Sequence, residues 1–117
     1  KKFDIHDRIF RFVISVLKLI KEIPNTEENK IIKNQIIRSV TSVGANDQEA
    51  DGVSSKRDFI HCFTIVRKEL KETHYWLRVL DELNSGLNII SRLQEGDELI
   101  KIVSTIIGNA AIKSKIS

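Results

Sequence analysis

The sequence predicts an all-α protein, an antiparallel up-down-up-down four-helix bundle. Three observations predict it: apolar residues recur at three- and four-residue steps in four segments, turn signals separate the segments, and no stretch alternates apolar and polar residues as a strand would. Four amphipathic helices joined by short loops are typical of such a bundle. The 117 residues are expected to form one domain over 1–117, long enough to bury a real core.

The first two helices are expected at about 4–22 and 27–50. Pro24, the only proline, ends the first because it lacks an N–H and restricts the residue before it. Asn25 or Thr26 then supplies the N-cap of the second helix. Gly52 is expected to close the second helix in a left-handed conformation. The apolar stripe of the first helix comprises Ile5, Ile9, Phe12, Val13, Val16, Leu17 and Ile20.

The third helix has the most regular pattern, from about residue 55 to 84. Its stripe comprises Phe59, Phe63, Val66, Leu70, Thr73, Leu77 and Leu80. Ser54 or Ser55 begins it, with Asp58 in its first turn. A short turn or a helical lead-in is expected at 86–94, followed by the fourth helix, whose apolar stripe runs from Leu99 to about Lys113. Gly96 and Gly108 are each expected to weaken that helix by about 1 kcal/mol relative to alanine.

Composition limits the class of protein. Hydrophobic residues make up 41% and charged residues 30%, which is ordinary for a globular domain, and the net charge of +3 permits nucleic-acid binding without arguing for it. Cys62 is the only cysteine, so a disulfide framework is impossible within one chain, and a cytoplasmic protein is expected. Charged residues interrupt every apolar run, so neither a membrane span nor a signal peptide is expected.

A polar stripe runs along the second predicted helix. Its members recur at steps of four, three, four and three: Gln35, Ser39, Ser42, Asn46 and Glu49. One interpretation is a packed polar network at a subunit interface or pore lining, because small hydroxyls allow close helix approach and a buried amide can fix register. The alternative is a solvated face. Trp76 is expected to be partly buried between helices or subunits, with base stacking as an alternative role.

A basic line runs along the third predicted helix. Its members are spaced four, three and four residues apart: Arg67, Lys71, His74 and Arg78. Cations spaced along a rigid rod suit a nucleic-acid backbone, so these four residues are candidate phosphate contacts. The alternative is a solvated face in which Glu69, Glu72 and Asp81 neutralise the line.

No catalytic or metal-binding constellation is evident in the sequence. Asp58 and His61 form the one acid-x-x-His pair, whereas a diiron bundle needs two such motifs and two further glutamates. Cys62 follows His61 directly, and adjacent residues on a helix diverge by about 100°, so they cannot act as a nucleophile–base pair. We therefore expect no enzyme activity, no cofactor, no metal and no small-molecule substrate.

The middle of the chain resembles a known family. The residues that carry the resemblance are Gln35, Ser42, Ala45-Asn46, Glu49, Gly52, Ser55, Asp58-Phe59-Ile60-His61 and Lys71-Glu72-Thr73-His74-Tyr75-Trp76-Leu77. This run is similar to the four-helix-bundle proteins encoded by intervening sequences in bacterial 23S rRNA genes, a family similar to the accessory variability determinant of diversity-generating retroelements. The resemblance implies an up-down-up-down bundle, in some members a homopentamer with a central pore.

Two hypotheses of function follow. The first is a non-catalytic homo-oligomer that binds RNA, DNA or a nucleic-acid enzyme through the basic line and the basic termini, with copy number multiplying the charge. The resemblance implies a reverse transcriptase as such an enzyme partner. The second is a scaffolding homo-oligomer that binds no nucleic acid, in which Arg67 and Lys71 would be held in ion pairs.

Overall fold

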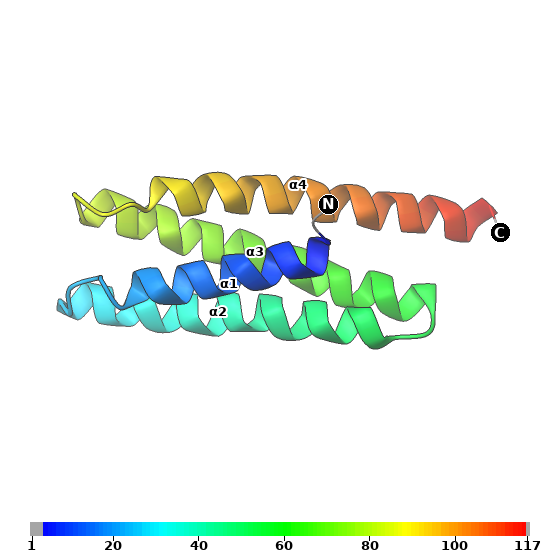
Figure 1. Cartoon of the computed structure of the whole chain (residues 1–117), viewed down its shortest axis with the longest axis horizontal. Helices are drawn as coiled ribbons and strands as arrows, with labels where there is room; N and C mark the ends of the chain where they lie inside the picture. The colour runs from blue at the N-terminus through cyan, green and yellow to red at the C-terminus, as the bar shows by residue number, and fades with distance from the viewer. Residues whose placement is uncertain (1–3, 117) are drawn as a thin grey trace.

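The structure, a computed structural model, describes residues 4–116, and from residue 113 on it describes the backbone alone. It contains four helices: α1 (Ile5–Ile20), α2 (Glu27–Gly52), α3 (Lys56–Leu83) and α4 (Ile90–Ile116). The chain reverses direction at each connection, so the helices run antiparallel, up-down-up-down (Figure 1). The described range contains no strand. The predicted fold class, an all-α four-helix bundle, is confirmed.

Side-chain caps set the starts of the first three helices. Asp4 accepts a hydrogen bond from the His6 amide at the start of α1. Thr26 Oγ1 accepts from the Asn29 amide at 3.1 Å and begins α2. Ser55 Oγ accepts from the Asp58 amide, also at 3.1 Å, and begins α3. Each cap satisfies an amide that has no partner within its own helix, which is why these residues mark the boundaries.

The prediction for Gly52 was wrong, and that for the start of the fourth helix was incomplete. Gly52 is the last residue of α2 with an ordinary negative φ, and the one described residue with positive φ is Gly86, at 82°, in the connection between α3 and α4. The fourth helix begins at Ile90, within the segment expected as a turn or helical lead-in, and passes through Gly96 and Gly108 without a break. Burial explains this: Ile89 and Leu99 are fully buried, so packing outweighs the low helix propensity of the two glycines.

The core lies along the shared axis of the four helices. Each helix packs against two neighbours, in the order α1–α2–α3–α4 and back to α1. The bundle is therefore a square in section, with four sides named here by the two helices that form them. Fully buried residues from every helix meet at its centre, among them Ile9, Val16, Ile36, Val43, Phe63, Leu70, Leu77, Leu99 and Val103.

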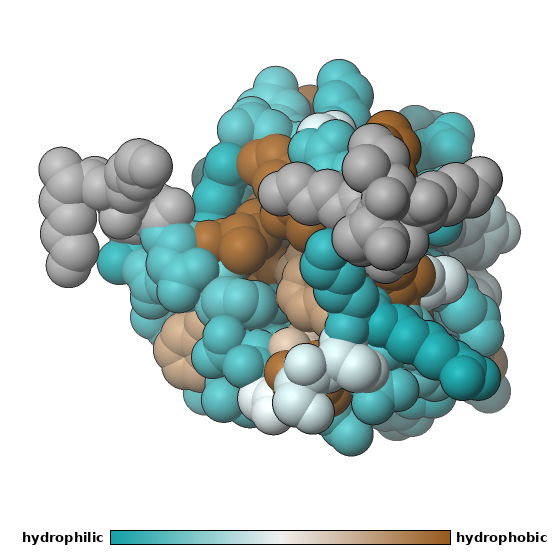
Figure 2. Space-filling model, turned by 90° about the vertical axis from the view of Figure 1, so that its right-hand side faces the viewer, coloured by the Kyte–Doolittle hydropathy of each residue, from teal (hydrophilic) through white to brown (hydrophobic). Residues whose placement is uncertain are grey.

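At one end of the bundle only three helices are present among the described residues, because α1 is the shortest helix. Arg8, near the start of α1, lies beside Glu95 and Glu98, so α4 continues past α1 from about residue 100. In Figure 1, α1 begins short of the turn between α2 and α3, and α4 extends beyond that turn. Figure 2, which looks onto this end, shows apolar surface between hydrophilic margins. No helix among residues 4–116 is both long and apolar enough to cross a membrane.

Candidate functional site

The outer surface of α3 is divided between two kinds of charge. Glu69 and Glu72 lie on the side of α3 that faces α2, where both approach Arg38. Arg67, Lys71 and Arg78 lie about half a turn around the helix, on the side toward α4. This separation defines two candidate surfaces, one on the α2–α3 side of the bundle and one on the α3–α4 side.

On the α2–α3 side, one guanidinium joins two carboxylates and an indole. Arg38 pairs with Glu72, and its Nη1 lies 3.6 Å from Glu69 Oε1. Trp76 Nε1 donates to Glu72 at 3.2 Å, and Arg38 also donates to Gln35 Oε1. We call these five residues the Arg38 cluster. Glu69 Oε1 is buried without a hydrogen-bond partner within the described chain. A buried oxygen in that state retains unused acceptor capacity.

Only some residues of the predicted polar stripe make contacts with α3. Ser39 is fully buried and contacts Thr73 of α3, so it lies inside the subunit. Asn46 donates to the backbone and side chain of Ser42 on its own helix. Gln35 and Trp76 meet through the Arg38 cluster. Glu49 is exposed and forms no ion pair with a described residue. The stripe is a packed network near Ser39 and a surface elsewhere, and its role at a subunit interface stays a prediction.

The basic line is largely free of intramolecular ion pairs. Lys71 and Arg78 are exposed and Arg67 is half-buried, and none of the three has a carboxylate of the described residues within 4.0 Å. His74 differs from them, because its Nε2 is buried and lies 3.0 Å from Asp97 Oδ1 of α4. Glu69 and Glu72 do not neutralise these three cations within the chain, because both carboxylates turn to Arg38.

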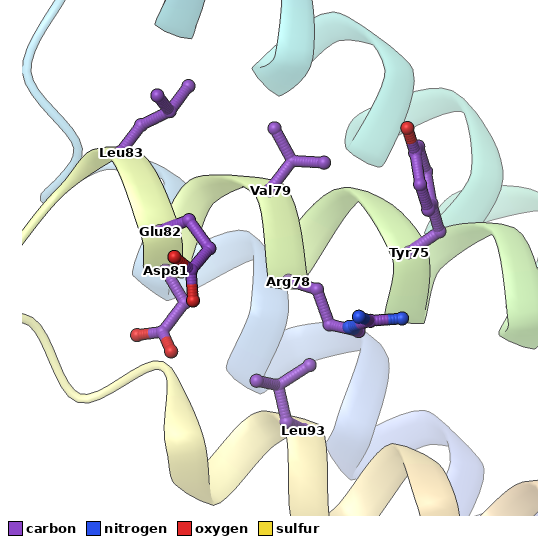
Figure 3. A pocket seen from close by; sticks show the side chains of 7 residues that line it. All are labelled: Tyr75, Arg78, Val79, Asp81, Glu82, Leu83 and Leu93. Carbon is purple, nitrogen blue, oxygen red and sulfur yellow. The ribbon is translucent and has the colours of Figure 1, made fainter.

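A groove lies beside the C-terminal end of the basic line, near Arg78. It has a volume of about 400 Å³ and is lined by Tyr75, Arg78, Val79, Asp81, Glu82, Leu83 and Leu93. In Figure 3, Arg78 and the two carboxylates lie on the α4 side of α3, near Leu93, while Tyr75, Val79 and Leu83 point toward α2. Asp81 and Glu82 have the helix spacing for a pair with Arg78, but no such pair forms, so all three charges are presented to solvent.

Two polar contacts near the helix ends were missed at the sequence level. His6 Nδ1 lies 2.7 Å from Asp47 Oδ1 and links α1 to α2. Burial alone would lower the pKa of His6, but the hydrogen bond to Asp47 and the charges of Asp47, Asp51 and Asp4 together raise it. Burial raises the pKa of Asp47, and its hydrogen bond with His6 offsets this only in part. Asp47 and Asp51 are four residues apart and so lie on one face of α2. This spacing is the one sequence signal that could have revealed the contact with His6.

The second missed contact pairs two asparagines at the other end. Asn29 donates to Asn84 Oδ1 at 2.9 Å, and Asn84 donates back to Asn29 Oδ1 at 3.2 Å. Each amide also donates to a backbone carbonyl, of Pro24 and Leu80 respectively. The pair therefore ties both loops at this end to the helices, a structural role with no sequence signal beyond two polar residues next to turns.

The residues considered for chemistry lie apart or are buried. Cys62 is buried, and burial raises its pKa, which disfavours the reactive thiolate. His61, at the preceding position of the helix, is exposed. Among the described residues, no three His, Cys, Asp or Glu side chains are grouped to hold a metal ion.

Comparison with known proteins identifies the family. The model of the 23S rRNA-intervening sequence protein family matches residues 1–107. The chain belongs to this family. The resemblance noted on residues 35–77 is therefore confirmed, and it extends over all but the last residues.

A solved structure supports the assignment. It is the 1.70 Å crystal structure of a protein of unknown function from the S23 ribosomal protein family of Bacteroides thetaiotaomicron. The two sequences are 32% identical, the TM-score is 0.80, and the match covers 89% of this chain and 98% of that one. Among curated proteins none matches the chain. Membership of the 23S rRNA-intervening sequence protein family thus agrees with the four-helix bundle of the structure.

Proposed function

We propose that this protein is a non-catalytic homo-oligomer that binds RNA or DNA, or an enzyme acting on them, through the basic line on α3. The observation that carries the proposal is the separation of charge on α3. Because Glu69 and Glu72 turn to Arg38, the cations of Arg67, Lys71 and Arg78 stay available to phosphate. Available cations on a rigid helix are what a phosphate backbone requires.

Oligomerisation makes this modest charge effective. One chain carries a net charge of only +3, so a single copy would bind nucleic acid weakly. A ring of copies, pentameric as the family resemblance implies, would present several basic lines to one strand and multiply their affinities. The basic termini would add to this charge; Lys1 and Lys2 lie outside the described residues, as do the side chains of Lys113 and Lys115.

The alternative is a scaffolding homo-oligomer that binds no nucleic acid. The acidic residues next to the basic line favour it, because Asp81, Glu82 and Asp97 would repel a phosphate backbone close to Arg78 and His74. In that case Arg67, Lys71 and Arg78 would pair with carboxylates of a neighbouring copy.

Binding of single-stranded RNA at several salt concentrations distinguishes the two. We expect fluorescence anisotropy of a labelled oligonucleotide to show binding at low salt whose affinity falls as salt rises. In the double variant Lys71→Ala/Arg78→Ala, binding should weaken. The slope of log affinity against log salt should also fall, by about 1 for each phosphate that is no longer neutralised.

The matched control is Lys21→Ala/Lys30→Ala. It removes the same charge from two exposed positions away from the line, one directly after the end of α1 and one on α2. If the control weakens binding as much as the test variant, net charge alone is responsible and the basic line is not the site. Absence of binding at low salt favours the scaffold.

A further inference from the structure

The groove beside the C-terminal end of the basic line has exposed apolar walls. Tyr75 and Leu83 are two turns of α3 apart, about 12 Å, and Val79 lies between them (Figure 3). Tyr75 is 54% exposed and Leu83 is 57% exposed, so both side chains are presented to solvent and not to the core. The volume of about 400 Å³ lies within the usual range of sites for small organic groups, so one planar ring system has room in the groove.

The ring of Tyr75 is supported from one side by the Arg38 cluster. The ring of Trp76 packs against it edge to face, with the ring centroids 5.0 Å apart and an interplanar angle of 68°. Trp76 Nε1 in turn donates to Glu72, whose carboxylate pairs with Arg38. These contacts restrict the Tyr75 ring before any ligand arrives, so little side-chain freedom is lost when a flat group stacks on its exposed face.

One of the two carboxylates of the groove lies on the same face of α3 as these apolar residues. At about 100° per residue, Glu82 is only about 20° around the helix from Tyr75, whereas Asp81 is about 120° away, toward α4. Glu82 is exposed, and neither its carboxylate nor the Arg78 guanidinium forms an ion pair with a described residue. Glu82 therefore presents two free acceptor oxygens at the edge of the groove, next to the aromatic ring.

We propose that this groove binds an unpaired guanine base of the strand whose phosphates contact the basic line. The inference rests on the proposed function and names its ligand more closely. On its Watson–Crick edge guanine presents two adjacent donors, N1–H and the N2 amino group, and an ionised carboxylate accepts both with its two oxygens. Adenine and cytosine present an amino group beside a ring-nitrogen acceptor, and uracil presents one donor between two acceptors. Each of these three bases would turn an acceptor toward the Glu82 carboxylate, so Glu82 selects guanine.

The proposal gives the acidic residue next to the basic line a role in binding. Glu82 contacts the base, while Arg78, between Glu82 and the rest of the line, donates to a phosphate of the same strand. Contacts to phosphate position a strand and contacts to base edges supply its sequence preference, so the two side chains divide these roles. In a double helix the Watson–Crick edge of guanine is paired, so the ligand is a single strand with its bases unstacked.

Two RNA oligonucleotides of equal length and charge test the inference: a uridine oligonucleotide, and the same oligonucleotide with one central guanosine. We expect fluorescence anisotropy at low salt to show roughly tenfold tighter binding of the guanosine oligonucleotide, a typical effect of one bidentate base contact. Inosine in place of guanosine lacks the N2 amino group and should remove most of this difference. Glu82→Gln should bring the ratio of the two affinities close to one. Asp81→Asn removes the same charge from the same groove and should leave the ratio at roughly tenfold.

The aromatic wall has its own pair of variants. Tyr75→Ala should weaken binding of the guanosine oligonucleotide by roughly fivefold or more, the usual effect of losing one base stack, whereas Tyr75→Phe should keep the wild-type affinity. Because Tyr75 and Glu82 are exposed, these variants should fold.

Three results would contradict the guanine site. If Asp81→Asn lowers the ratio as much as Glu82→Gln, the charge of the groove and not the Glu82 contact is responsible. Equal affinities of the wild type for the two oligonucleotides overturn the site and leave a cationic protein segment as the occupant that the two carboxylates favour. In both cases, salt-dependent binding of the uridine oligonucleotide leaves the proposed function standing. Absence of binding of either oligonucleotide at low salt overturns both proposals.

Discussion

The hydroxyls of Ser39 and Thr73 lie 2.7 Å apart at the fully buried contact between α2 and α3. Each hydroxyl also has a backbone acceptor on its own helix: Thr73 Oγ1 lies 2.8 Å from the Glu69 carbonyl oxygen, and Ser39 Oγ lies 3.3 Å from the Ile36 carbonyl oxygen. This polar contact in an apolar core fixes how the two neighbouring helices are aligned. In this alignment Arg38 lies opposite Glu69 and Glu72, and Arg67, Lys71 and Arg78 have no ion pair with a described residue.

A double-mutant cycle should detect this contact. Ser39→Ala and Thr73→Val are each expected to lower the free energy of unfolding by about 1 kcal/mol, the usual value of one such hydrogen bond. The double variant should lose less than the sum, because removing both hydroxyls leaves no unpaired group behind. Urea denaturation followed by circular dichroism measures all three. Strict additivity would show that the two hydroxyls do not interact.

Loss of the asparagine pair should be more costly. Asn29→Ala removes the hydrogen bonds to Pro24 and Asn84 and leaves a polar group of Asn84 unsatisfied, so the free energy of unfolding should fall by about 2 kcal/mol. The control, Asn34→Ala, changes an exposed asparagine on the same helix and should lie within about 0.5 kcal/mol of wild type. Equal effects of the two variants in the same urea titration would exclude the proposed role of Asn29.

Most of the fold could be predicted because its signals are local. The apolar periodicity and the side-chain caps at Thr26 and Ser55 depend on a few adjacent residues, and these predictions were confirmed. The start of α4 was predicted only as a turn or helical lead-in, because it depends on the burial of Ile89 by the other helices. Gly52 was expected to be left-handed because glycine often is at helix ends, but the φ of a given glycine depends on the loop that follows.

The surfaces could be predicted only within one helix. Spacing correctly placed Arg67, Lys71 and Arg78 on one side of α3. It could not say where Glu69 and Glu72 would turn, because their partner, Arg38, is on another helix and the register between helices has no periodic signal. The contact of His6 with Asp47, 41 positions apart, escaped for the same reason.

The two glycines Gly86 and Gly108, before and within α4, should respond oppositely to alanine. Gly108 lies in the helix interior, and an added Cβ would meet nothing within 4 Å, so Gly108→Ala should raise the free energy of unfolding by about 0.5–1 kcal/mol. Gly86 has a φ of 82°, which costs alanine about 1–2 kcal/mol, so Gly86→Ala should destabilise. Thermal denaturation of both variants tests this. A stabilising Gly86→Ala would mean that the turn is not left-handed in solution.

The contact between His6 and Asp47 should make stability depend on pH. His6 is surrounded by Asp4 of its own cap and by Asp47 and Asp51 of α2, while α3 contributes the apolar ring of Phe63. Its pKa is raised in the folded state, so the protonated form favours folding. The stabilisation is complete below the ordinary histidine pKa of 6.5 and is lost as pH rises through the raised value. Asp47 also has a raised pKa in the folded state, so its protonated form favours folding too. That contribution begins to fall as pH rises above the ordinary aspartate pKa of 3.8, well below the range in which His6 titrates.

The free energy of unfolding should therefore fall as pH rises above about 6.5, and His6→Gln should remove most of that fall. Urea titrations at steps between pH 6 and pH 9 measure the slope, which reports the difference in bound protons between the unfolded and folded states. His61→Gln is the matched control, because His61 is exposed on α3 and has no ion pair among the described residues. The free energy of unfolding of His6→Gln would still fall with pH, and that of His61→Gln would not, if His61 were the group responsible. That result would refute the role of the contact between His6 and Asp47.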